Sequence, residues 1–97
     1  MSRAAAKQCV VAYAPDAARQ YLWHVVLPAE ATIAAAIDAA RRQARTQEPD
    51  IPWDSATVGV FGEPRTRADL PDDGDRIELY RPLRDDPRAR RRTKARG

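Results

Sequence analysis

Cysteine, histidine and aromatic residues are scarce in this chain of 97 residues. It has one cysteine and one histidine, and its aromatic residues make up only 6%. A single cysteine cannot form an intramolecular disulfide, and it cannot supply the clustered thiolates of a structural zinc site. The core must therefore be built mainly from aliphatic residues and alanine, and we expect a reducing, cytoplasmic location.

Long apolar runs are absent as well. No stretch reaches the ~20 apolar residues of a membrane-spanning helix, and residues 1–7 lack the apolar run of a secretory signal. The hydrophobic fraction is nevertheless 43%, close to that of an ordinary globular domain. We expect a soluble domain with no membrane insertion.

Two segments near the N-terminus predict an antiparallel β-hairpin. Residues 7–14 and 20–27 are rich in β-branched and aromatic residues, and Pro15 and Asp16 predict the turn between them. Side chains alternate along a strand, so one face of the second segment holds Tyr21, Trp23, Val25 and Leu27. The other face holds Leu22, His24 and Val26.

The apolar spacing becomes helical after Pro28. Apolar residues recur at the spacing of one helical stripe, and Thr32 is a suitable N-cap, so we predict a helix over residues 32–46. Residues 57–62 and 76–81 are predicted to be strands. In the loop between them, Leu70 is expected to pack onto the core, and Gly74 to adopt a positive φ in a turn.

The predicted order is therefore strand, strand, helix, strand, strand. One helix must cover one face of a mixed four-stranded sheet, and the helical crossover allows the first and last strands to pair in parallel at its centre. This α+β arrangement, ββαββ, is the β-grasp or ubiquitin-like fold. We expect the β-grasp domain to span residues 1–83 and a basic flexible tail to span residues 84–97.

Several segments also follow the pattern of a known family. The run from Asp73 to Leu83, the segment Val58 to Gly62, and Asp86-Pro87 before an arginine-rich run are the most specific. In these segments the chain resembles the RnfH family of small bacterial ubiquitin-like proteins. The predicted hairpin and the start of the predicted helix match the pattern of that family as well. The resemblance covers nearly the whole chain and implies a β-grasp fold, but it implies neither a reaction nor a particular partner.

Residues suited to catalysis or metal binding do not form a plausible site. Strand alternation places Cys9 and His24 on opposite faces, whereas a thiolate nucleophile needs an adjacent base. The acidic residues between Asp69 and Asp75 lack the ligand spacing of a calcium loop. No glycine-rich phosphate loop is present. We therefore predict no catalytic, cofactor-binding or metal-binding residues, and no enzymatic activity.

Basic side chains are concentrated at the C-terminus. Residues 82–97 hold seven basic and two acidic side chains, whereas residues 1–81 hold ten and twelve. No aromatic residue accompanies the run for base stacking, so nucleic-acid binding is less favoured than a solvated tail or contact with an acidic protein surface. The basic cluster is Arg88, Arg90, Arg91, Arg92, Lys94 and Arg96.

The chain ends in a single glycine, Gly97, which follows Arg96. Ubiquitin and bacterial sulfur carriers act through a terminal Gly-Gly. This difference disfavours the alternative of a sulfur carrier or conjugation substrate.

The sheet face that the helix leaves uncovered is the strongest candidate site. Its residues are too apolar for a surface that only meets water, and such patches mark interaction sites. We predict that it docks a protein partner whose identity the sequence does not give. The alternatives are a homodimer or a cover formed by Leu83 and the tail. The predicted partner-binding residues are Val10, Leu22, His24, Val26, Phe61 and Tyr80, around the small Ala12.

Overall fold

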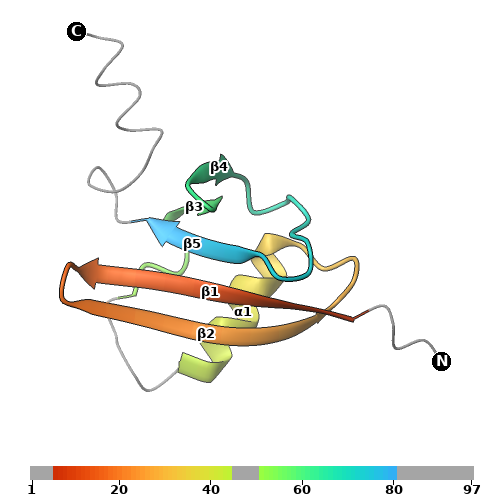
Figure 1. Cartoon of the computed structure of the whole chain (residues 1–97), viewed down its shortest axis with the longest axis horizontal. Helices are drawn as coiled ribbons and strands as arrows, with labels where there is room; N and C mark the ends of the chain where they lie inside the picture. The colour runs from red at the N-terminus through yellow and green to blue at the C-terminus, as the bar shows by residue number, and fades with distance from the viewer. Residues whose placement is uncertain (1–5, 45–50, 81–97) are drawn as a thin grey trace, which may run out of the picture.

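The computed structural model describes residues 6–44 and 51–80 of the chain. Within these residues five strands form one sheet, and one helix, α1 (Ile33–Ala44), lies behind it in Figure 1. The strands are β1 (Ala6–Asp16), β2 (Arg19–Pro28), β3 (Thr57–Val60), β4 (Glu63–Arg65) and β5 (Arg76–Tyr80). The predicted tail, the domain boundary at residue 83 and the helix end at residues 45–46 lie outside the described residues.

The sheet has the order β2-β1-β5-β3-β4, and β1 pairs with β5 in parallel. The other pairs are antiparallel. The predicted α+β, β-grasp fold, with the first and last predicted strands paired at the centre, is therefore confirmed. The chain passes through α1 between β2 and β3, and this crossover allows β5 to return parallel to β1.

The prediction of four strands was one strand short. Residues 63–65, expected to be loop, form β4 against β3. Pro64 lies in this strand, which is tolerated because β4 is at the edge of the sheet. The predicted strand 57–62 ends at Val60, and Phe61 and Gly62 form the turn into β4.

The start of α1 is fixed by Thr32 and by a distant loop. The Thr32 Oγ1 accepts a hydrogen bond from the Ala35 N–H at 3.2 Å, which confirms the predicted N-cap. The N–H groups of Ile33 and Ala34 donate to carbonyl oxygens of residues 69 and 67, each at 2.9 Å. The loop before β5 thus satisfies backbone donors that a helix start leaves free.

The core lies between α1 and one face of the sheet. The apolar stripe of α1 packs against the predicted face of β2 and against β1 and β5, and Val11, Ile33 and Ile77 are fully buried. The rings of Tyr21 and Trp23 stack at 5.8 Å, and Trp53 contacts Trp23 at 5.0 Å between centroids. Aromatic packing therefore covers this part of β2.

The loop before β5 is anchored by Lys7, not by Leu70. The prediction for Leu70 was wrong, because its side chain is 61% exposed. Lys7 is buried, and its Nζ donates to the carbonyl oxygens of Ala29, Ala31 and Pro71 at 2.8, 2.8 and 2.7 Å. All three ammonium donors are used, so one cation joins the β2–α1 connection to the loop before β5.

The acidic residues of this loop bind backbone N–H groups. The Asp73 Oδ1 accepts from the Gln8 N–H at 2.8 Å, and the Asp75 Oδ2 accepts from the Asp72 N–H at 2.8 Å. Gly74 has a φ of 89°, which confirms the predicted turn. These carboxylates therefore stabilise the backbone conformation of the loop.

Candidate functional site

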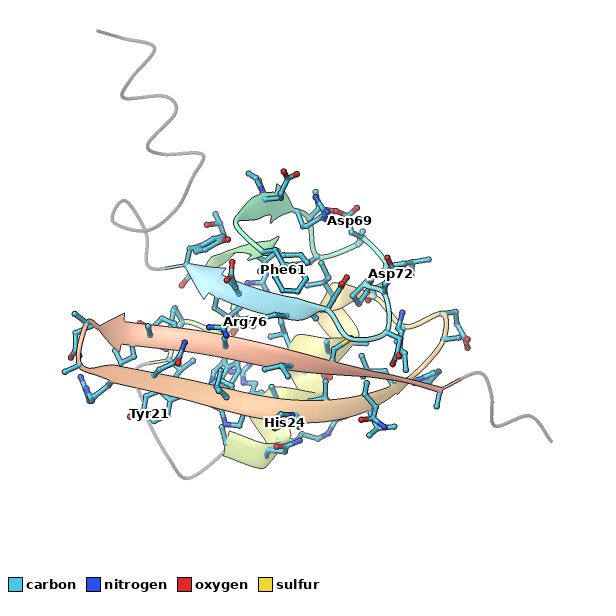
Figure 2. The ribbon with its side chains drawn as sticks, viewed as in Figure 1. Tyr21, His24, Phe61, Asp69, Asp72 and Arg76 are labelled. Carbon is cyan, nitrogen blue, oxygen red and sulfur yellow. The ribbon has the colours of Figure 1, made fainter. Side chains whose placement is uncertain are left out.

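The candidate site is the open face, which we define as the side of the sheet opposite α1. The strand register sets one row of residues across it. Val10 on β1 lies opposite His24 on β2 and opposite Arg76 on β5. Phe61 follows Val60, the partner of Ile77, and so extends the row beyond Arg76. Figure 2 shows Phe61, Arg76 and His24 in this order across the sheet.

Three large apolar side chains of the open face are exposed. The exposed fraction is 70% for Val26, 64% for Phe61 and 46% for Leu22. His24 is exposed and Val10 is half-buried. Four of the six predicted residues therefore present accessible side chains on this face.

Tyr80 lies on the open face, but the prediction that it is exposed was wrong. Its side chain is only 9% exposed. The ring covers Gly59 on the neighbouring strand, where an added Cβ would lie 2.5 Å from the Tyr80 Oη. The absence of a side chain at Gly59 gives the ring room to pack against the backbone, which removes Tyr80 from the accessible surface.

Arg76 and Glu78 form a polar centre that the sequence analysis missed. The Glu78 Oε1 accepts hydrogen bonds from the Tyr80 hydroxyl at 2.6 Å and from the Gly62 N–H at 3.0 Å. Its Oε2 lies 3.7 Å from the Arg76 Nε. The available signal was alternation, because residues 76, 78 and 80 share a face. This centre separates Leu22 and Val26 from Phe61.

The β3–β4 turn places Phe61 in an unusual conformation. Phe61 and Gly62 have φ values of 50° and 82° between the paired residues Val60 and Glu63, as in a type I′ turn. Asparagine and glycine are preferred there, and a bulky residue in the left-handed region costs about 1–2 kcal/mol. The hydrogen bond from Gly62 to Glu78 fixes this turn to the open face.

A shallow groove lies beside the polar centre, toward the β1–β2 turn. Its volume is ≈ 610 Å³, and the small residues Ala12 and Ala14 contribute to its lining. Arg76, Glu78 and Tyr80 also line it. The open face therefore offers a depression next to its exposed apolar side chains.

Cys9 and His24 lie on opposite faces of the sheet, as predicted. Cys9 is buried in the core, where its Sγ lies 3.5 Å from the carbonyl oxygen of Asp72. Burial raises the pKa of the Cys9 thiol, which disfavours the thiolate. His24 is exposed on the open face. The two side chains therefore do not form a nucleophile and base.

No helix in the described part of the chain is both long enough and apolar enough to cross a bilayer. The described residues also hold no group of three metal-ligating side chains.

Comparison with known proteins identifies the family. The family model described as RnfH family Ubiquitin matches residues 8–94. The chain belongs to the RnfH family. It is 44% identical over 87 residues to Protein RnfH of Citrobacter koseri, an alignment that covers 88% of this chain and 85% of the relative.

Two further relatives agree with this assignment. Protein RnfH of Escherichia coli O45:K1 is 42% identical over 87 residues, covering 88% of this chain and 85% of the relative. Protein RnfH of Sodalis glossinidius is 42% identical over 77 residues, covering 79% and 80%. The resemblance noted in the sequence and the ubiquitin-like fold therefore lead to the same family.

Proposed function

We propose that this RnfH-family protein is a non-enzymatic, ubiquitin-like binding module that docks a protein partner through the open face. The observation that carries the proposal is Phe61. Its ring is 64% exposed, and its backbone is in a conformation that costs a bulky residue free energy. Neither core packing nor turn formation accounts for a phenylalanine there, whereas contact with a partner does.

The surroundings of Phe61 support the same function. Leu22 and Val26 supply further apolar area, and Arg76 and Glu78 supply charges that can orient a partner. Protein interfaces combine apolar anchors with polar groups in this way. The groove beside Glu78 offers room for a partner side chain.

The non-enzymatic part of the proposal rests on Cys9 and His24. The thiol is buried with a raised pKa, and it faces the core while the imidazole faces solvent. A thiol in that position is protected from substrates and lacks a base to activate it.

The test is affinity capture from cells of the source organism with single variants of the full chain. Phe61→Glu and Val26→Asp should each lose the captured partner while keeping the circular dichroism spectrum of the folded protein. Leu70→Glu is the matched control. The Leu70 side chain is 61% exposed, similar to Phe61, but it lies in the loop before β5. If both open-face variants are folded and capture the same partners as the control, the open face is not the docking surface.

A further inference from the structure

The strand register gives the open face two adjacent rows of residues. The first, which we call the Arg76 row, consists of His24, Val10, Arg76 and Phe61 (Figure 2). The second, which we call the Glu78 row, consists of Leu22, Ala12, Glu78 and Gly59. Each row therefore holds one charged residue on the central strand β5, and the two charges have opposite signs.

Arg76 and Glu78 lie close together without satisfying each other fully. The Arg76 Nε is 3.7 Å from the Glu78 Oε2, which is too long for a hydrogen bond, and this buried Nε has no hydrogen-bond partner. Both hydrogen bonds that the Glu78 carboxylate accepts go to its other oxygen, Oε1. The two side chains are 39% and 25% exposed. A matching surface must therefore present an anion to Arg76 and a cation to Glu78.

A second copy of the chain meets this requirement by symmetry. In a two-fold dimer, every contact between two different residues occurs twice, once in each direction. If the two-fold axis runs across the strands, between the Arg76 row and the Glu78 row, Arg76 of each copy faces Glu78 of the other. One placement therefore forms two ion pairs at the centre of the interface.

The same placement matches side chains of different size. Val10 of one copy faces the small Ala12 of the other, and the exposed ring of Phe61 faces Gly59. The surface is low at Gly59, because the Tyr80 ring occupies the space where a side chain would begin. Larger groups of one row therefore meet smaller groups of the other, which allows the two faces to approach closely.

The remaining contact and the position of the helix agree with this arrangement. On β2, the exposed Leu22 of one copy faces the exposed His24 of the other. Sheets that pack face to face lie about 10 Å apart. α1 lies behind the sheet in Figure 1, so neither helix comes between the two open faces.

We propose that a second copy of the chain covers the open face of the free protein, in the two-fold dimer described above. The inference rests on the proposed function, because it names what occupies the docking surface before another protein binds there. A protein partner must then displace the second copy, so that dimer formation and partner docking compete for the same residues.

Sedimentation velocity of the full-length protein over a concentration series tests the dimer. We expect the wild type to dimerise and Arg76→Glu to dimerise at least about tenfold more weakly, because two glutamates then face each other. Arg65→Glu is the matched control. Arg65 is 40% exposed and lies 3.8 Å from Glu63, but it pairs with Val58, whose side chain faces the core. A wild type that stays monomeric up to about 1 mM, or an Arg76→Glu variant as dimeric as the control, would overturn the proposal.

Mixing two variants tests which residues face each other. Glu78→Arg by itself should also dimerise weakly, because two arginines then face each other. An equimolar mixture of Arg76→Glu and Glu78→Arg restores opposite charges at both contacts, and it should form a heterodimer. Two folded variants that form no heterodimer would contradict the proposed arrangement.

A measurement on the wild type needs no variant to fold. If Glu78→Arg does not fold, because Glu78 also binds Tyr80 and Gly62, isotope-filtered NMR of mixed labelled and unlabelled protein decides the question. The Leu22 methyl groups of one copy should show contacts with the His24 ring of the other. A dimer that lacks these contacts would overturn the proposal.

Two comparisons separate a failure of this inference from a failure of the proposed function. If the wild type stays monomeric and Phe61→Glu loses a cellular partner that Leu70→Glu retains, the open-face function stands and the dimer proposal fails. If the mixed variants form a heterodimer and Phe61→Glu still captures every cellular partner, the open-face function fails and the dimer proposal stands.

Discussion

At the level of single residues, the docking role proposed for Phe61 can be separated from its effect on stability. Replacing it with asparagine gives the Asn-Gly sequence that a type I′ turn prefers. We expect Phe61→Asn to raise the free energy of unfolding by about 1 kcal/mol, because the strain of a bulky left-handed residue is relieved. The same variant should lose partner capture, because the exposed ring is gone. Urea unfolding and affinity capture measure the two effects, and a less stable variant would contradict the assignment of strain.

Lys7 is the residue whose loss should harm the fold most directly. Lys7→Met keeps an unbranched apolar stem but leaves three carbonyl oxygens without their donor. We expect the free energy of unfolding to fall by about 3 kcal/mol, because these buried carbonyl oxygens lose their hydrogen bonds. Gln8→Met is the matched control, since the neighbouring side chain is exposed and should change stability by no more than about 0.5 kcal/mol. Similar urea midpoints for the two variants would show that Lys7 is not an anchor.

Cys9 should make stability depend on alkaline pH. Burial raises the pKa of its thiol above the ordinary value of 9.0, so the unfolded chain ionises first as pH rises. The contribution of the protonated Cys9 thiol to the free energy of unfolding is therefore complete below pH 9.0. It is lost as pH rises through the raised pKa of the thiol in the folded state.

The comparison with Cys9→Ala isolates this contribution. The wild type should be more stable than the variant at about pH 7, and the difference should shrink toward about pH 10. Urea unfolding across this range measures it. A difference that stays constant or grows would show that the thiol does not titrate as its burial requires.

At the level of elements, the contact between β3 and β5 depends on Gly59. An added Cβ there would lie 2.5 Å from the Tyr80 Oη and 2.7 Å from the carbonyl oxygen of Glu63. We expect Gly59→Ala to lower the free energy of unfolding by about 2–3 kcal/mol, because ring and strand must both shift. In a Tyr80→Ala background the same change should cost less, since only the backbone contact remains. An equal cost in both backgrounds would mean that the ring does not pack on Gly59.

Glu78 links these elements to the open face. It joins the end of β5, through Tyr80, to the β3–β4 turn, through the Gly62 N–H. The orientation of Phe61 therefore depends on a carboxylate on the central strand. This explains how a turn at the edge of the sheet is held against the open face.

At the level of the whole molecule, basic side chains are concentrated in the C-terminal run, whereas residues 1–81 hold more acidic than basic side chains. We expect the basic run in residues 84–97 to steer association with an acidic partner, which affects the association rate and its dependence on salt. Replacing Arg90, Arg91 and Arg92 with glutamine in the full chain should slow association at low salt by up to about tenfold and leave dissociation unchanged. Arg65→Gln is the control on the described domain.

Stopped-flow association of the captured partner at several salt concentrations tests this prediction. A change in the dissociation rate alone would show that the tail forms part of the bound interface. Identical salt dependence in wild type and variant would show that the tail does not steer association.

The sequence by itself determined the features that follow local backbone geometry. Alternation identified the core and open faces of β2, and helical spacing with Thr32 located α1. It also placed Cys9 and His24 on opposite faces and Gly74 in a turn of positive φ. A strand or helix imposes its period on its own residues, so these features can be inferred without knowing what surrounds them.

Only the tertiary structure decided pairing and burial between distant segments. β4 forms because the turn at Phe61 folds three residues with little strand character onto β3. Lys7 is buried because three carbonyl oxygens from two connections converge on its ammonium group, and Leu70 is left exposed. Tyr80 is hidden because the neighbouring strand has a glycine beneath its ring. In each case the environment of a side chain is built by residues far away in the sequence, which no local period specifies.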